Sequence, residues 1–360
     1  MIILAIESSC DETAVALVRD GREVLTDQVF SQADLHAIYG GVVPEIASRS
    51  HVEGISQLAD RALAVTGLTR GDIDAVAVTC APGLIGALLV GVNFAKSAAL
   101  ALGVPLIPVH HVRGHIAANY LAHPDLEPPF VCLCVSGGTS LLVDVKGYTE
   151  MEILGATRDD AAGECFDKIA RVMGLGYPGG APLDRAAQGG NDKAFSLPRV
   201  HIQDAPLDMS FSGLKTAMLN LIHNAQQKGE ELPVADLAAS FSAAVSEELV
   251  PRTMAAAQAK GYGKVAVVGG VAANSRIRRD LEQACQAAGC TLYLPPLKLC
   301  GDNGSMIGSQ GYYEYLAGTR AGTDLNAYAN REISRPYGTG TAPVFPSPVE
   351  KSVESVHNSL

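Results

Sequence analysis

The predicted order of strands and helices in the first third of the chain begins again after residue 130, and this duplication restricts the possible folds more than any other feature. Alternating apolar positions and polar turns predict three short strands first. A helix with Pro44 and Glu45 in its first turn follows, because proline is favoured at a helix start. In full, the strands span 2–8, 13–19, 23–30, 73–79 and 105–109, and the helices span about 44–65 and 85–102. The sequence therefore predicts a βββαβαβ unit.

The second half repeats the three strands and then carries additional helices. Its predicted strands span 130–136, 141–145, 151–154, 264–268 and 291–294. Its predicted helices span 159–173, 181–188, 213–227 and 234–260, with one after Asn274 and a last one from Asp302. The fold class expected from this pattern is α/β, built from two related units.

The length of the chain agrees with two units. At 360 residues it exceeds the size at which one hydrophobic core stops growing, so two lobes with a cleft between them are expected. We predict an N-terminal lobe over residues 1–122, completed by a helix at about 305–333, and a C-terminal lobe over 123–304. The segment 334–360 is rich in proline, glycine and serine and is predicted to be a flexible tail.

Charge and hydropathy exclude several classes of protein. The formal charge of −11 argues against a free-standing nucleic-acid binder, since such proteins concentrate lysine and arginine. The N-terminus lacks the basic flank of a signal peptide and is typical of a core strand. The most apolar run, 84–102, contains Asn93, Lys96 and Ser97, so a buried helix is favoured over a membrane span. We expect a cytoplasmic protein without a membrane partner.

The cysteines do not form a metal or disulfide pattern. None of the eight belongs to a CxxC pair, and Cys132 and Cys134 alternate on a predicted strand, facing one side. Reduced thiols in the core are therefore expected.

Two hairpin turns, one in each half, carry polar residues at matching places. ESSCDET lies between the first two strands of the first half, and VSGGTS between those of the second. Backbone N–H groups and hydroxyls in such turns would hold a nucleotide phosphate between the lobes, although Gly137 and Gly138 would also suit a simple tight turn. Glu7, Asp11 and Glu12 add negative charge at the first of these turns. Such a cluster would bind a metal, take part in proton transfer or simply be solvated.

Three glycine turns further along lie beside helices. They are GYPGGAPLD, FSGLKT and VVGGVAANSR. In the last, an apolar strand ends at Gly269 and Asn274 falls where a helix begins, the place where α/β folds bind ligands. A plain N-cap would equally explain Asn274, and a ribose contact or a polar turn would explain Asp184.

The segment HHVRGH indicates a metal site. His111 and His115 are four residues apart, so both imidazoles would project from one helix face. Asp302 would add a carboxylate from the neighbouring lobe, and two histidines with one aspartate suit non-haem iron or catalytic zinc. Helix packing or capping would also explain the pair, and the glutamate of a zincin protease is missing because Val112 follows His111.

Together these segments resemble the tRNA N(6)-adenosine threonylcarbamoyltransferases, once called O-sialoglycoprotein endopeptidases. The resemblance covers about residues 1–335 and implies the duplicated, two-lobed fold of actin, Hsp70 and sugar kinases, with a nucleotide and metal site in the cleft. Its motifs occur in the family's order: ESSCDET, HAIYGGVVPEIASRSH, HHVRGH, VSGGTS, DDAAGECFDK, GYPGGAPLD, FSGLKT, GGVAAN and CGDNGSMIG.

The resemblance implies roles for particular residues. The metal ligands would be His111, His115 and Asp302, holding Fe2+ or, as the alternative, Zn2+. Asp11 and Glu12 would be the acidic pair required for activity. The substrate would contact Cys134, Val135, Ser136, Gly137, Gly138, Asp167, Gly180, Asp184 and Asn274.

Two positions depart from the family's usual pattern. The family reads SGGHT where this chain has SGGTS at 136–140, which removes a histidine beside the phosphates, and GEAFDK where this chain has Cys165. The implied reaction moves a threonylcarbamoyl group from threonylcarbamoyl-AMP to the adenosine 3′ of the anticodon in tRNA. The implied partners are a shorter paralogous subunit and a small P-loop ATPase.

Three other functions compete with this one. A metallopeptidase would use the same histidines, and a small-molecule kinase of the same fold would also bind nucleotide between lobes. A nucleotide-gated scaffold would need no transfer chemistry. The phosphate-binding turns argue against the peptidase, and the His-His-Asp set argues against the kinase.

Overall fold

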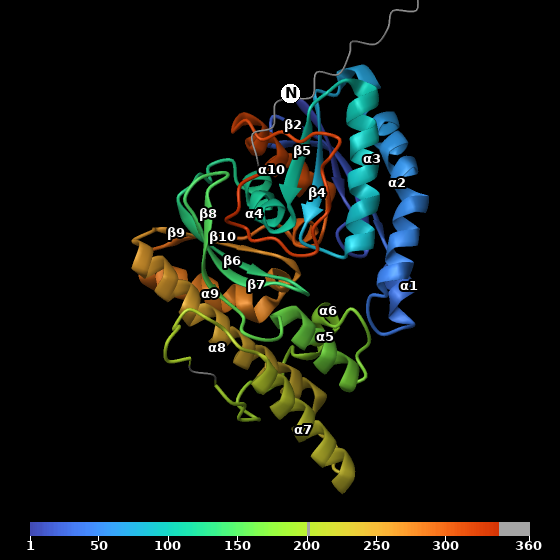
Figure 1. Cartoon of the computed structure of the whole chain (residues 1–360). Coiled ribbons are helices and arrows are strands. Elements are labelled where there is room, and N and C mark those ends of the chain that lie inside the picture. Colours follow the sequence, from blue (N-terminus) through green and yellow to red (C-terminus); the bar gives the residue numbers. More distant parts are fainter. Residues whose placement is uncertain (200–201, 338–360) are drawn as a thin grey trace, which may run out of the picture.

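Two five-stranded mixed sheets with the same strand order form the frame of the molecule (Figure 1). The structure is a computed structural model and describes residues 1–199 and 202–337. The first sheet has the order β3-β2-β1-β4-β5 and the second β10-β9-β6-β7-β8. In each, the first three strands along the chain pair antiparallel and the last two join in parallel. The predicted α/β duplication is therefore confirmed.

The strands and helices lie close to their predicted positions. The first sheet contains β1 (Ile2–Glu7), β2 (Glu12–Arg19), β3 (Glu23–Ser31), β4 (Ala75–Ala81) and β5 (Leu106–His110). The second contains β6 (Phe130–Val135), β7 (Ser140–Val145), β8 (Met151–Ala156), β9 (Lys264–Val268) and β10 (Thr291–Tyr293). The helices are α1 (Ala33–Ala37), α2 (Pro44–Thr66), α3 (Ile85–Leu102), α4 (His111–Ala122), α5 (Ala162–Val172), α6 (Gly180–Ala186), α7 (Ser212–Lys228), α8 (Val234–Lys260), α9 (Ser275–Ala288) and α10 (Gly304–Leu316). Short 3-10 turns occupy Arg70–Asp72, Gly270–Ala273 and Leu297–Leu299.

Four helices differ from the predicted ranges: α1 and α4 were not among them, although the histidine spacing implied a helix at α4, and α5 and α10 differ at their ends. The short helix α1 was not predicted, and α5 begins at Ala162 rather than at residue 159, because Asp159 instead accepts hydrogen bonds from the start of α7. The helix expected over about 305–333 ends at Leu316. Its end is set by Gly318, which adopts a left-handed conformation (φ 84°) that terminates helices.

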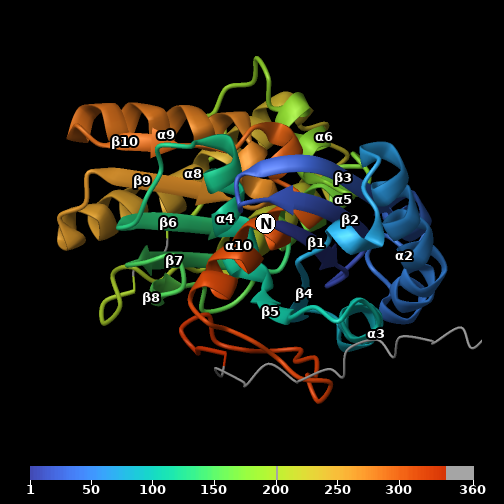
Figure 2. The same cartoon turned by 90° about the horizontal axis from the view of Figure 1, so that it is seen from above.

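The helices form layers around the two sheets (Figures 1 and 2). α2 and α3 cover one face of the first sheet, and α8 and α9 cover the second. α4 and α10 pack against each other between the sheets, so α4 contacts strands of both. By length and composition α3 would pass for a membrane span, and one third of it is buried in the protein. In the structure it lies on β4 and α2.

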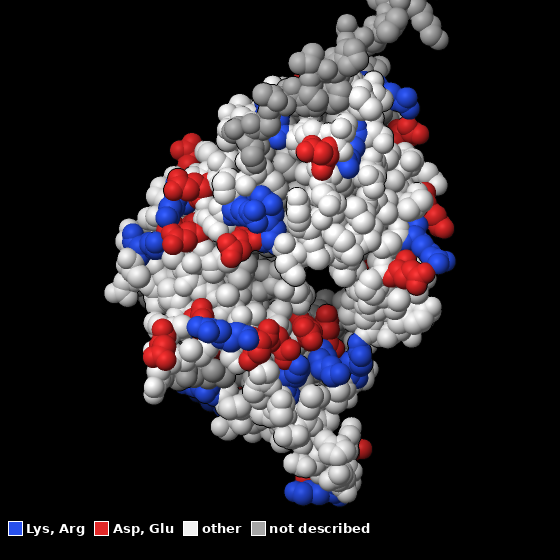
Figure 3. Space-filling view, in the orientation of Figure 1, with Lys and Arg blue, Asp and Glu red and all other residues white. Residues whose placement is uncertain are grey.

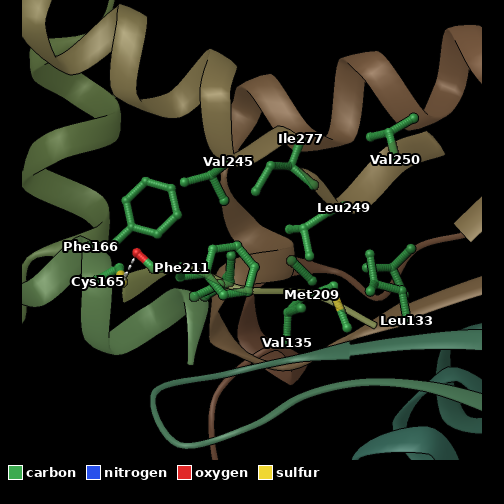
Figure 4. Close-up of a cluster of buried hydrophobic side chains, with 14 of the residues drawn as sticks. Leu133, Val135, Cys165, Phe166, Met209, Phe211, Val245, Leu249, Val250 and Ile277 are labelled. Atoms are coloured by element: carbon green, nitrogen blue, oxygen red, sulfur yellow. Dashed lines mark hydrogen bonds between the residues drawn. The ribbon is translucent and has the colours of Figure 1, made fainter. Parts of the chain in front are cut away.

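The hydrophobic core is divided among the layers. One cluster joins the second sheet to α5, α8 and α9 through Leu133, Phe166, Val245 and Ile277 (Figure 4). Separate clusters fill the space under α2 and α3 and around α4 and α10. All eight cysteines are free, as predicted, and most are buried in these clusters.

The chain after α10 is fastened to the first sheet. The Cys80 thiol donates to the hydroxyl of Tyr337, which is 9% exposed. Tyr337, within the predicted tail 334–360, is therefore held against the first sheet, and the remainder of that segment from 338 lies outside the described residues. The lobe boundary near residue 122 stays a prediction, since α4 contacts both sheets.

Replacing Gly308 with alanine is expected to destabilise the fold by about 1–3 kcal/mol, because the added methyl overpacks the contact between α10 and the first sheet. Its Cβ would lie 2.5 Å from Cγ2 of Val18 and 3.2 Å from Cβ of Ala5. Urea denaturation measures the change. Gly54→Ala in α2 is the matched control: its Cβ would meet only Phe30 at 3.9 Å, so a gain of about 0.5–1 kcal/mol is expected. Equal effects in the two variants would contradict this account of the packing.

Candidate active site

Two histidines and an aspartate converge between the lobes. His111 and His115 lie one turn apart on α4, and their ring centroids are 4.6 Å apart. Oδ1 of Asp302 lies 3.5 Å from Nε2 of His111 and 3.0 Å from Nε2 of His115. One ligand atom from each residue lies within 4.8 Å of the others. The three predicted ligands are thus brought together from segments far apart in the sequence.

The ends of two helices hold these side chains in place. His110 caps α4, since its Nδ1 accepts from Val112 N while its Nε2 faces Arg331 O, so neither ring nitrogen is directed at the three ligands. Asn303 caps α10 by accepting from Met306 N. Asp27 of β3 accepts from Gly304 N and so fixes the backbone directly after Asp302.

The three donors fit a metal ion. His115 is 4% exposed, and neither of its ring nitrogens has a well-directed hydrogen bond with a described residue. A buried polar atom without a partner is costly, so such a nitrogen beside a carboxylate is suited to coordinate a metal ion. Two imidazoles and a carboxylate with open positions suit iron or zinc.

The electrostatics agree with a cation at this place. Burial alone would raise the pKa of Asp302, but His111 and His115 lower it to about 2. Burial likewise opposes protonation of His111, yet Asp302 and Glu7 raise its pKa to about 9. The surroundings of the three side chains therefore favour a positive charge at this place.

The acidic turn between β1 and β2 lies beside this centre. Burial, Asp302 and Asp11 together raise the pKa of Glu12 to about 9. Ser31 donates to the Glu12 carboxylate over 3.3 Å. Glu12 therefore lies in the electrostatic field of the predicted ligand Asp302, and Asp11 lies close to Glu12.

A cavity of about 520 Å³ opens between α5, α6 and the start of α9. Five predicted substrate residues line it: Gly137, Asp167, Gly180, Asp184 and Asn274. Phe166, Pro178, Val271 and Leu297 supply apolar walls. The volume and the mixed lining are typical of a small-ligand site.

Some polar groups of the cavity already make hydrogen bonds within the protein, and others do not. Asn274 caps α9 by accepting from Ile277 N, and its buried Nδ2 has no partner among the described residues. Asp184 accepts from the backbone and hydroxyl of Ser275, and Asp167 accepts from Gly179 N. The plain N-cap and the ligand contact predicted for Asn274 are therefore compatible.

The other predicted substrate residues lie at the edge of the cavity or behind it. Cys134 and Val135 are buried, and the Cys134 thiol contacts Cys132, so only their backbone can face a ligand. Ser136 closes the turn by donating from its N–H to Thr139 O. The turn is retained with threonine in place of the family's histidine.

Two residues near the site, Thr79 and Tyr177, were not predicted to act there, and Glu7 was predicted only as a member of the acidic cluster with Asp11 and Glu12. Glu7 contacts His111, and Thr79 of β4 donates to Glu7. Tyr177 lies close enough to Asp11 and Asp167 for both to raise its pKa, together with burial, so it links the cavity to the acidic turn. In the sequence, the acidic cluster with Asp11 and Glu12 was the signal for Glu7. Cys165, by contrast, lies in the core, where its thiol faces Phe211 O (Figure 4).

Comparisons with known proteins agree with this geometry. The family model of the tRNA N6-adenosine threonylcarbamoyltransferases (TsaD) matches residues 23–309. A protein of that name from Clostridium botulinum (strain 657) is 52% identical over 92% of this chain and 97% of its own length. One from Clostridium perfringens is 51% identical over 92% and 98%. This chain belongs to that family.

Solved structures with low identity show the fold of this threonylcarbamoyltransferase family member. Component A of (R)-2-hydroxyglutaryl-CoA dehydratase from Acidaminococcus fermentans is 15% identical with a TM-score of 0.52, covering 88% of this chain and 99% of that one. Full-length HypF is 15% identical with a TM-score of 0.58, covering 88% and 46%. The duplicated two-lobed fold of the actin, Hsp70 and sugar-kinase class is confirmed.

Proposed function

We propose that this chain transfers the threonylcarbamoyl group from threonylcarbamoyl-AMP to the N(6) amine of the adenosine 3′ of the anticodon, in tRNAs that read codons beginning with A. AMP is released. One observation carries the proposal beyond family membership: a nucleotide-sized cavity and a His-His-Asp set are joined by the acidic turn and Tyr177. A space-filling view shows a hollow between the upper and lower parts of the molecule (Figure 3).

The cavity residues would hold the AMP part of the donor. The N–H groups of Gly137 and Gly138 make no backbone hydrogen bond with the described residues, so they are free to donate to a phosphate. Asp167, Asp184 and the free Nδ2 of Asn274 offer polar contacts to the nucleoside.

The transfer forms a C–N bond between the adenine amine and the carbamoyl carbon and breaks the bond from that carbon to the phosphate oxygen. AMP leaves with the electron pair, and the amine loses a proton. Asp11 and Glu12 are the candidate bases; because its pKa is raised, Glu12 could accept the proton only with a cation bound beside Asp302. A metal held by His111, His115 and Asp302 would supply Lewis acidity toward the carbonyl. The two lobes would also limit hydrolysis of the donor by excluding water.

Iron(II) is the proposed ion, and zinc(II) is the alternative. A 2-His-1-carboxylate set with open positions suits Fe2+, and imidazole with carboxylate also suits Zn2+. Metal analysis of protein purified without oxygen and without chelator distinguishes the two.

The mouth of the cleft offers groups that suit single-stranded RNA. Tyr39 is 56% exposed in the loop before α2. The Arg171 guanidinium lies 3.1 Å from where a Cβ on Gly40 would be, so this loop meets α5 across the cleft. Lys168 and Arg185 are also exposed on α5 and α6. Aromatic and cationic groups together are typical of surfaces that bind looped-out bases.

Partner proteins would supply the remaining contacts with the tRNA. With a net charge of −11 the chain has few lysine and arginine side chains for contacts with phosphates. We propose the shorter paralogous subunit and the small P-loop ATPase as partners in the cytoplasm. Exposed apolar side chains on α2 and α3, Val52, Val65, Ile85 and Leu100, support a protein contact. The surface over α3 is largely uncharged (Figure 3).

Nucleoside analysis tests the proposal. The protein, its partners, threonylcarbamoyl-AMP and unmodified tRNA are incubated, and the digested tRNA is examined by mass spectrometry for threonylcarbamoyladenosine. Its formation is expected. Cleavage of a glycoprotein in place of this product would favour the metallopeptidase, and ATP-dependent phosphorylation of a small molecule would favour the kinase.

Replacing Asn274 with serine is expected to raise the KM for threonylcarbamoyl-AMP about 2- to 10-fold, because one hydrogen bond to the nucleotide is lost. Serine caps helices as well as asparagine does, so the free energy of unfolding is expected to change by less than about 0.5 kcal/mol. Initial rates at varied donor concentration measure the KM. An unchanged KM would show that Nδ2 does not face the donor, and Asn274→Ala separates the two roles by losing the cap as well.

A further inference from the structure

Glu7 is a fully buried carboxylate at the end of the central strand β1. It is 0% exposed, and each of its oxygens faces hydrogen-bond donors. Oε1 accepts from Ser9 N at 2.5 Å, and Oε2 accepts from the Thr79 hydroxyl at 2.5 Å. Oε2 also lies 3.1 Å from Nδ1 of His111.

Burying an ionised carboxylate at this position costs free energy of folding, so a compensating interaction or a function is expected. Burying an ionised group is unfavourable unless partners compensate it. The residues before Glu7 on β1 are apolar and buried, and a small apolar side chain would suit the strand as well. Among the described residues, His111 is the group able to carry a positive charge that contacts Glu7 directly, while His51 interacts with Glu7 only through its charge.

The contacts fix which ring nitrogen of His111 carries hydrogen. An ionised carboxylate accepts only, so Nδ1 of His111 is the donor to Oε2. The Ser9 hydroxyl approaches the same Nδ1 at 3.1 Å. Nε2 is then left on the opposite side of the ring, facing Asp302 at 3.5 Å. In the neutral ring, that nitrogen holds the free lone pair.

His115 lacks such support. Its Nδ1 has no hydrogen-bond partner among the described residues, and its position is set by packing in α4. The two histidines are therefore held by different means. Only the orientation of His111 depends on the first sheet, through Glu7 of β1 and Thr79 of β4.

We infer that Glu7 is a positioning residue, which fixes the Nδ1–H tautomer and the ring direction of His111 so that Nε2 faces the proposed metal. Thr79 and Ser9 in turn hold the Glu7 carboxylate. The inference rests on the metal site of the proposed function. Carboxylates that receive the second N–H of a ligating histidine commonly change metal affinity about 10- to 100-fold when they are replaced.

Metal titration tests the inference without any measure of catalysis. Zn2+ binding to the full chain is followed by calorimetry for the wild type, Glu7→Gln and Glu12→Gln. The amide introduced by Glu7→Gln would turn an N–H toward one of the three donors, so an affinity about 10- to 100-fold weaker is expected. Glu12→Gln replaces a neighbouring carboxyl group that makes no hydrogen bond to His111, and it controls for loss of a carboxyl group beside the site. Equal losses in the two variants would overturn the inference.

A spectroscopic experiment gives an answer even where Glu7→Gln does not fold. The 15N shifts and N–H correlations of His111 are recorded in the wild-type, Zn2+-loaded protein, with assignment by His111→Gln. Hydrogen on Nδ1 and metal on Nε2 are expected, and the reverse would overturn the inference. If the wild type binds no metal, the metal site itself fails. If it binds with the expected tautomer but Glu7→Gln binds equally well, only the role of Glu7 fails.

Discussion

Replacing His115 with alanine is expected to abolish stoichiometric metal binding and to lower transfer to tRNA at least about 100-fold. The residue supplies one of three converging donors, and its imidazole is buried beside Asp302. Lewis-acid stabilisation by a metal is worth several kcal/mol, and each 1.36 kcal/mol changes a rate about tenfold. Metal analysis and initial rates of transfer are measured on the same preparations.

A neighbouring histidine provides the control. His110 lies next to the ligands in sequence but faces Arg331 O, and asparagine at this position would still cap α4. His110→Asn is expected to retain the metal. Loss of metal in this variant, or full activity in His115→Ala, would contradict the assignment of His111, His115 and Asp302 as the ligands.

Replacing Arg113 with methionine is expected to destabilise the fold by about 3–5 kcal/mol, because it leaves a buried carboxylate without its cation. Arg113 belongs to HHVRGH but points away from the cleft. It is 1% exposed, contacts Glu314 at 2.7 Å and donates to Ile333 O. The pair joins α4 to α10 and to the chain beyond it. Chemical denaturation measures the loss.

A double variant separates the effect of losing the ion pair from the effect of losing the other contacts of Arg113. In Arg113→Met/Glu314→Leu both charges are absent, and a buried pair replaced by apolar residues is often neutral in stability. Most of the stability lost in Arg113→Met is expected to return. A double variant no more stable than the single one would show that Arg113 acts mainly through its bonds to Ile333.

Periodicity and turn chemistry were sufficient to predict the frame of the fold. Helix α3 was predicted at Ile85–Leu102, where the structure has it, and both strand triplets fall within two residues of their predicted ends. The repeated order of strands is visible in one sequence because each strand is a short apolar run between polar turns. The early end of α10 was missed because tyrosines continue its apolar pattern, whereas Gly318 alone stops it.

The sequence was sufficient to predict the side chains that would bind a metal, but not the residues that hold those side chains in position. His111 and His115 share a helix face by spacing alone, whereas Asp302 was only a possible third ligand until the family resemblance implied it, since nearly 190 residues separate it from His115. The cavity contains only part of the predicted substrate set. Cys134 and Val135 lie on a strand whose side chains are buried, which a motif cannot reveal. Contacts such as Glu7 with His111 depend on how β1 lies beside α4, and no local pattern encodes that.

The most direct test of the proposed function follows both products of one reaction. Threonylcarbamoyl-AMP labelled in threonine is mixed with unmodified tRNA, the partner subunits and either wild-type protein or His115→Ala. The account predicts equal amounts of labelled tRNA and AMP with the wild type, and neither above background with the variant. AMP release without labelled tRNA, or the same labelling with the variant, would contradict a metal-dependent transferase in this cleft.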